Sequence, residues 1–559
     1  MRESGLRRVI RNGFVNGVVR GFTVLEGDRI LAVGEEPDAG YWIRPGDAVH
    51  DAEGAWILPA FIDSHIHVFG LAREKRLVDL HGIDRIETLV ERLREAPQAS
   101  GDWLLGTGWD ETLLGRLPDR LVLDRFFPDR PVFLWRRCLH IAAANGLALE
   151  RAGLGPGSTV QAGSLDRFED GSLTGILREA AAHTVARQIP EPTRVQTAFA
   201  VRTVLEDLAT MGIASVSTND GTGSRLEPWE TYLMLRDTRE NGATYPEVFW
   251  DPPLAALDAV RTCGLRSFDG REGADPDALA ASGVPGLRMG AIKFVTDGSL
   301  GGRTAYMLSP YAGEEGAGHR GLPRLSADEL AQGIRTASEA GLRVCLHAIG
   351  DAAARGVLEA LKAVGGHVAV KRPRIIHSQF VTEEDRKRYR TVGAIADVQP
   401  LFAVSDLPLR ERVGEAFRYG YAWRRLLLEG AHMAFGSDAP VESPNPILGV
   451  RAARYRGGAR RDIPGWDGER LDLATALRLY SEGGAYAQAS ETLRGRLLPG
   501  QRADVVVVNP SLFDVEDGPA SAASYRDRPD LRPRLSVLGG SPVQADAFET
   551  VRPSYVHRT

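Results

Sequence analysis

The feature that most constrains the fold is a repeated alternation of short apolar strands with amphipathic helices along most of the chain. Helical stretches, such as residues 194–212 and 326–341, separate most of the strands. The predicted strands cover residues 56–63, 213–217, 247–250, 290–297, 343–347, 374–378, 394–399 and 433–438. Alternation at this period indicates parallel strands joined by crossover helices. Eight such units close on themselves, so we expect an α/β chain built on a (β/α)8 TIM-like barrel.

The two ends of the chain follow a different pattern, with short β-rich runs and turns. Gly27 and Asp28 separate two apolar runs, which is typical of a hairpin. Residues 502–510 form another run rich in β-branched residues. We therefore predict that residues 1–56 and 490–559 form one small discontinuous β-sandwich domain.

The barrel domain is then expected over residues 57–489, and one part of it is too long for a single crossover. Residues 72–190 contain two further strand-like runs and a predicted helix over 176–187. We interpret this segment as an insertion after the first barrel strand.

Composition excludes several classes of protein. The net charge of −6 is spread along the chain, whereas a nucleic-acid-binding protein would carry a basic patch. The three cysteines include no CxxC pair, which argues against a thiolate zinc site and favours a reducing, cytoplasmic environment. No apolar run approaches the roughly 20 residues of a membrane helix. The oligomeric state is left open, a homodimer included.

Two histidines directly follow the first predicted barrel strand. His65 and His67 are separated by one residue, and residues i and i+2 of a strand face the same way. Two imidazoles in this arrangement can chelate one ion. An HxH pair alone is a weak motif, because a single histidine at a strand end is more often a core or loop residue.

The other strand ends carry further potential ligands. His347 ends the fifth strand, His377 the sixth and Asp438 the eighth, while Lys293 lies in the fourth. Singly, Asp438 could cap a helix and Lys293 could be an edge residue. Together they gather where barrel enzymes collect catalytic groups. Four histidines and a carboxylate suit zinc or a similar divalent ion.

The sequence resembles the amidohydrolase superfamily, and within it the amidohydrolase-3 group that includes the YtcJ-like proteins and N-substituted formamide deformylases. The HxH, DGSLGGRTA and GSDAPV segments are specific to this resemblance, and the matches cover nearly the whole chain. They are LPAFIDSHIHV, GWDET, PVFLWRRCLHIAAANGLAL, GILREAA, LATMGIASV, IKFVTDGSLGGRTA, LHAIGD, IIHSQF, DVQPLF, AFGSDAPVESPNP and GRLLPGQRADVVVV.

The resemblance implies roles for the matched residues. His65, His67 and Asp438 would hold one metal ion, His347 and His377 a second, and Lys293 would bridge both as a carbamate. The number of ions, one or two, is open. Asp438 would serve as general base and then acid for a metal-activated hydroxide. The expected substrate contacts are Trp109, His140, Glu179, Asp297, Arg303 and Gln399.

The expected reaction is cleavage of the C–N bond of a small, neutral N-substituted amide. The segments expected to line the pocket carry bulk and few charges, which favours an uncharged substrate. One alternative is a mononuclear amino-heterocycle deaminase, but those enzymes carry a glutamate shortly after the fifth-strand histidine, and residues 347–351 read HAIGD. Another is a non-catalytic binding protein on the same fold.

Overall fold

A computed structural model of the chain divides into two compact units. Unit 1 contains Met1–Gly70 and Leu205–Thr559, and unit 2 contains Leu71–Val204. The expected insertion over residues 72–190 falls within unit 2. The structure describes residues 7–95, 102–136, 141–160, 163–221, 227–239, 244–269, 283–284, 286–313, 318–365, 372–458, 463–515, 527–544 and 547–550.

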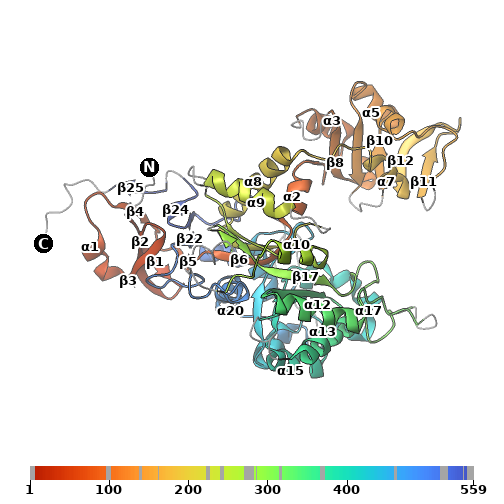
Figure 1. Ribbon diagram of the computed structural model, residues 1–559. Coiled ribbons are helices and arrows are strands. Elements are labelled where there is room, and N and C mark those ends of the chain that lie inside the picture. The colour runs from red at the N-terminus through yellow and green to blue at the C-terminus, as the bar shows by residue number, and fades with distance from the viewer. Residues whose placement is uncertain are drawn as a thin grey trace. The chain divides into compact units, whose positions relative to one another are not determined.

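One sheet of unit 1 contains strands from both ends of the chain (Figure 1). Its path runs β24-β23-β22-β5-β1-β2-β3, and β4 and β25 lie off this path. The predicted hairpin is confirmed, since Glu26 pairs with Arg29 across the turn at Gly27. The bounds are β1 (Arg7–Val15), β2 (Val19–Glu26), β3 (Arg29–Glu35), β4 (Ala48–Asp51), β5 (Trp56–Pro59), β22 (Val505–Val508), β23 (Leu535–Leu538), β24 (Ser541–Pro542) and β25 (Glu549–Thr550).

The first predicted barrel strand is two strands. β5 pairs antiparallel with β22 of the terminal sheet, whereas β6 (Phe61–Ile66) pairs in parallel with β13 (Ile213–Thr218). The change of partner occurs at Ala60, whose N–H donates to Asp504 (3.0 Å), while the next N–H, of Phe61, donates to Gly212 (2.8 Å). A continuous apolar run concealed this break, because both strands are buried.

The remaining predicted strands are confirmed to within a few residues. Together with β6 and two strands that the sequence did not predict, β15 and β16, they form two five-stranded sheets. The orders are β15-β16-β14-β13-β6 and β17-β18-β19-β20-β21, and all pairs except β15–β16 are parallel. The bounds are β14 (Glu247–Trp250), β15 (Gly283–Val284), β16 (Leu287–Met289), β17 (Ala291–Val295), β18 (Arg343–Ala348), β19 (Arg374–His377), β20 (Ile395–Val398) and β21 (His432–Phe435).

Backbone hydrogen bonds connect the two sheets at two places. The N–H of Lys293 donates to Pro252 beyond β14 (2.8 Å), and the N–H of Asp438 donates to His65 in β6 (2.7 Å). The first bond ties β17 to the segment that follows β14, and the second ties the loop after β21 to β6. This arrangement positions the candidate site.

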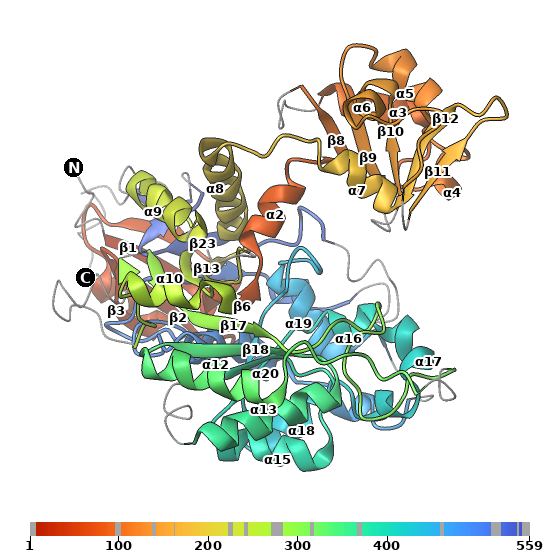
Figure 2. The ribbon, with the colours of Figure 1, turned by 45° about the vertical axis from the view of Figure 1, so that its right-hand side comes forward.

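Helices connect successive strands of the second sheet, as the sequence pattern predicts. α12 (Ala327–Glu339) precedes β18, α13 (Asp351–Val364) follows it, and α15 (Glu383–Val392) follows β19 (Figure 2). α12 begins with a capping box between Ser326 and Glu329, which satisfies two backbone donors. Among the described residues, no helix is both long enough and apolar enough to cross a membrane.

Unit 2 is built on a six-stranded sheet of order β11-β12-β10-β9-β8-β7. The helix predicted over residues 176–187 is wrong in its first part, because β12 (Leu173–Glu179) precedes α7 (Ala180–Ala186). Ile176 and Leu177 are buried on opposite faces of the sheet, in separate core clusters. The other strands are β7 (Val78–Asp79), β8 (Leu104–Trp109), β9 (Val132–Arg136), β10 (Ile141–Ala144) and β11 (Gly163–Arg167).

Candidate metal centre

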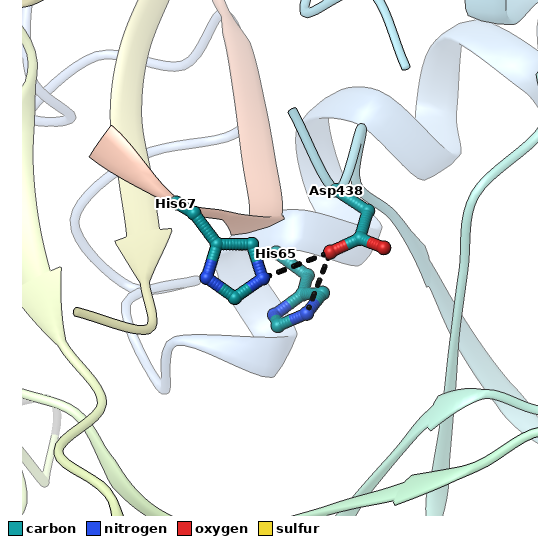
Figure 3. A group of neighbouring side chains, drawn as sticks. All are labelled: His65, His67 and Asp438. Carbon is teal, nitrogen blue, oxygen red and sulfur yellow. Dashed lines mark hydrogen bonds and ion pairs between the residues drawn. The ribbon is translucent and has the colours of Figure 1, made fainter. Parts of the chain in front are cut away.

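Three predicted ligands converge at the carboxyl end of β6 (Figure 3). Ligand atoms of His65, His67 and Asp438 all lie within 4.8 Å of one another. The Asp438 carboxylate is 3.0 Å from His67 Nε2 and 3.3 Å from His65 Nε2, through the same oxygen, Oδ1. Asp438 lies three residues beyond the end of β21, in the left-handed backbone region with φ 59°. The backbone hydrogen bond from its N–H to His65 holds it there.

Lys293 lies beside this group, in β17. Its Nζ is 3.1 Å from His65 Nε2, and the residue is buried. Burial lowers the pKa of Lys293, although nearby groups that include Asp438 act in the opposite direction. A lysine with a lowered pKa is more often in its neutral, nucleophilic form.

The other two predicted ligands face each other at the ends of β18 and β19. His347 Nδ1 lies 3.0 Å from His377 Nε2, and the ring centroids are 4.5 Å apart. The His377 ring also lies 5.7 Å from the His65 ring. The structure therefore brings all six predicted ligands to one end of the parallel strands.

The hydrogen bonds of the outer ring nitrogens determine which inner nitrogens carry lone pairs. His67 Nδ1 contacts the carbonyl oxygen of Asn219 (2.7 Å), which can only accept, so Nδ1 carries hydrogen. In a neutral ring Nε2 is then an acceptor, and it faces another acceptor, Asp438 Oδ1. Only a cation, either a proton or a metal ion, makes this contact favourable.

The same argument applies with more force to His347 and His377. His347 Nε2 faces two acceptors, Gly298 O (3.1 Å) and Asp297 Oδ1 (3.2 Å), so it carries hydrogen. His377 Nδ1 donates to Gln399 Oε1 (2.8 Å). The two remaining nitrogens, His347 Nδ1 and His377 Nε2, carry lone pairs and lie 3.0 Å apart. Imidazole nitrogens oriented by such outer hydrogen bonds are typical metal ligands, so the donor set fits a divalent ion.

The protonation of these groups agrees with this fit. Burial lowers the pKa of His377 well below its ordinary value, and His347 adds to the effect, so a proton between the two rings is disfavoured. Burial also lowers the pKa of His65, with Lys293 adding to it. Burial acts to raise the pKa of Asp438, but hydrogen bonds to His65 and His67 outweigh it and hold the pKa well below the usual range. His67 differs: burial acts to lower its pKa, but the hydrogen bond and charge of Asp438 outweigh it and raise the pKa, so a proton and a metal ion compete for this nitrogen. Neutral histidines and an ionised carboxylate are the metal-binding forms.

Sequence reasoning missed a buried residue that connects the ligands. Asp63 Oδ1 accepts the N–H of His65 (3.1 Å) and that of Ser437 (3.0 Å), so it ties β6 to the loop that carries Asp438. Burial raises the pKa of Asp63 to about 7. The sequence offered one indication of this role, since Asp63 lies two residues before the predicted ligand His65 in the DSHIH segment.

Two residues expected to contact substrate instead support the ligands. Asp297 is fully buried, and its carboxylate accepts the N–H groups of Tyr306 (2.9 Å), Ile349 (3.2 Å) and Gly350 (2.9 Å) besides facing His347. Gln399 uses its amide oxygen on His377 and its amide nitrogen on the backbone of Asp397. Each polar side-chain atom of the two residues therefore already bonds within the protein.

The other expected substrate contacts are placed differently. Trp109 belongs to the core of unit 2, and its indole N–H donates to the backbone of Leu134. Because the side chain is only 1% exposed, it has no surface for a substrate. Glu179 is the residue that precedes α7 in unit 2. Arg303 lies half-buried in the loop after β17, with φ 53°. His140 lies outside the described residues.

Comparisons with known proteins agree with this geometry. The profile of the amidohydrolase family matches residues 48–544. Putative amidohydrolase YtcJ of Bacillus subtilis is 31% identical over 482 residues, covering 83% of this chain and 85% of its own. The N-substituted formamide deformylase of Arthrobacter pascens is 25% identical, covering 89% and 91%. An uncharacterized metal-dependent hydrolase from Pyrococcus furiosus superposes with a TM-score of 0.71 at 28% identity, covering 91% and 100%.

Proposed function

Because the chain belongs to the amidohydrolase family and is a hydrolase acting on carbon–nitrogen bonds, we propose that it cleaves a neutral N-substituted amide at a divalent metal centre. The observation that carries the proposal is the pair of inner nitrogens on His347 and His377, which face each other 3.0 Å apart with both outer nitrogens already bonded to acceptors.

Our proposal includes the closed barrel and the full ligand set. The two parallel sheets would form a single (β/α)8 barrel, joined through the Lys293 and Asp438 backbone hydrogen bonds. His65, His67 and Asp438 would hold one ion. His347 and His377 would hold the second, with Lys293 bridging as a carbamate. Zinc is the expected ion, because histidine nitrogen and carboxylate oxygen are its common ligands.

The residues of the chain divide the chemistry among them. When bound, a divalent ion would supply an acidified water molecule and would polarise the scissile carbonyl. The pKa of Asp438 is held well below its usual range, so its carboxylate can accept a proton and deliver it to the leaving nitrogen. Asp297 and Gln399 hold the two histidines in the tautomers that direct lone pairs inward.

A neutral substrate agrees with the surroundings of the ligands. The Phe402 ring lies 6.0 Å from the His377 ring, so an apolar side chain lies beside the predicted ligands. Arg303 is the only cation that the resemblance assigned to substrate binding. A strongly charged substrate would require several convergent arginines or lysines. The relative from Arthrobacter pascens is described as acting on N-substituted formamides, which fits this class.

A deaminase would place an available acid shortly after His347, and the structure supports none there. Asp351 is the first carboxylate after that histidine. Its two oxygens already accept from the N–H of Leu308 (2.7 Å) and from the hydroxyl of Tyr419 (2.6 Å). We therefore prefer amide hydrolysis.

The test is a panel of substrates assayed with metal-depleted enzyme before and after adding zinc. The panel contains matched neutral amides, charged amides and amino-heterocycles. We expect zinc-dependent release of amine from N-formyl or N-acyl compounds with aryl or alkyl substituents. Ammonia release from a heterocycle without any amide cleavage would overturn the proposal in favour of a deaminase. If the metal-loaded protein cleaved no compound of the panel, the result would favour a non-catalytic binding protein.

A further inference from the structure

Unit 1 contains a cavity that lies apart from the predicted ligands. Its volume is about 660 Å³, within the range of small-molecule sites. The first turn of α15, the segment leading into α18 (Trp423–Leu428) and residues 464–469 line it. None of the residues in the predicted metal centre contributes to its wall.

Four arginines line this cavity against two glutamates, in a chain whose net charge is −6. Two of the arginines are neutralised locally. Arg386 is buried and contacts Glu429 (3.3 Å), and Arg425 contacts Glu469 through both its side chain and its backbone N–H. These ion pairs offset the charges of Arg386 and Arg425.

The other two arginines of the lining are Arg418 and Arg424. Arg418 pairs with Glu415 at 3.4 Å, and both side chains are largely exposed, so the pair contributes little. Among the described residues, Arg424 makes no hydrogen bond or ion pair. The second lining acid, Glu383, pairs with Lys387 (3.1 Å), and this pair is also largely exposed. The four arginines still outnumber the two lining glutamates, so the lining carries net positive charge.

We propose that this cavity binds a small dianion, a phosphate or dicarboxylate group, between Arg418 and Arg424. Guanidinium groups bind such groups through paired, charge-assisted hydrogen bonds. The remaining lining hydroxyls are already in use, since Thr382 bonds to Asp385 and Tyr419 to Asp351, so the arginines supply the recognition. This site is independent of the proposed reaction.

The experiment measures binding of inorganic phosphate by calorimetry to the metal-depleted full chain, because a bound metal would itself take up phosphate. The site variant is the double substitution Arg418→Gln and Arg424→Gln. The control is Arg335→Gln, which removes an exposed arginine on α12 outside the cavity. We expect the site variant to weaken phosphate binding at least tenfold and the control to leave it unchanged.

Two further arms make the result decisive. Succinate, a dicarboxylate, should compete with phosphate, whereas chloride at matched ionic strength should not, because general screening affects every charge alike. Thermal melts without ligand verify that both variants fold like the parent chain. Equal phosphate binding by the site variant and the parent chain, or no measurable binding by the parent chain, would overturn the proposal.

Discussion

At the residue scale, the centre depends on buried side chains that hold neighbouring backbone groups in place. Asp63 illustrates this, since one carboxylate oxygen holds the backbone of both His65 and Ser437. We expect Asp63→Leu to lose about 2–4 kcal/mol of unfolding free energy, because two buried N–H groups lose their acceptor. Asp63→Asn keeps an acceptor oxygen and should lose much less. Urea unfolding of both variants measures this, and equal stabilities would refute the role of Asp63.

Asp438 is the residue on which proton transfer is proposed to depend. Asp438→Asn retains a similar shape but can no longer accept a proton in the same way. We expect turnover to fall by about 10²–10⁴-fold, the usual effect of removing a positioned acid–base. Substrate binding should persist in part. The ratio of kcat to that of the parent enzyme, measured at equal metal occupancy, checks this, and an unchanged kcat would exclude Asp438 as the base.

Glu442 makes stability depend on pH. Burial raises its pKa from 4.5 to about 7, and Asp406 and Asp438 add to the effect. Since the pKa is higher in the folded state, the stability that the group contributes is complete below pH 4.5 and is lost as pH rises through 7. Glu442→Gln should therefore melt like the parent chain near pH 4.5 and be more stable at pH 8, by about 1–2 kcal/mol after allowing for partial exposure. If the difference in melting temperature between Glu442→Gln and the parent chain were the same at pH 4.5 and at pH 8, this prediction would be contradicted.

At the scale of elements, Asp297 joins the loop after β17 to the end of β18. Its carboxylate accepts three backbone N–H groups, from Tyr306, Ile349 and Gly350. Asp297→Ala leaves three buried donors unpaired and removes the acceptor facing His347, so we expect a loss of about 3–5 kcal/mol and weaker metal binding. Asp297→Asn, which retains one oxygen, is the matched control. Chemical unfolding and metal titration together measure both effects, and metal affinity unchanged in Asp297→Ala would contradict the positioning role.

The sequence predicted most strands of unit 1 because buried parallel strands appear as short apolar runs between helices. It failed where local pattern and tertiary partners disagree. Ala60 lies inside an unbroken apolar run, and only pairing with two different sheets reveals the break. Residues 176–179 continue into a good helix-forming segment, yet they pair with β10 and β11. Long-range pairing therefore overrides local propensity there.

At the scale of the whole molecule, the gathering of the six predicted ligands could be predicted because strand ends of parallel sheets meet at one edge. The partners that orient the ligands could not. Asn219 and Gly298 act through backbone oxygens, which carry no side-chain signature. Trp109 matched a substrate-contact motif but is buried in the core of unit 2, a fact that depends on packing alone.

The measurement that tests the account most directly is the metal content of the purified chain and of one variant. His377→Ala removes one of the two facing nitrogens, and Arg335→Gln serves as a distant control. We predict about one to two equivalents of zinc or another divalent ion per chain, a lower content in His377→Ala, and loss of amide hydrolysis on chelation that added metal restores. Full activity in a metal-free preparation that resists chelators would contradict the account.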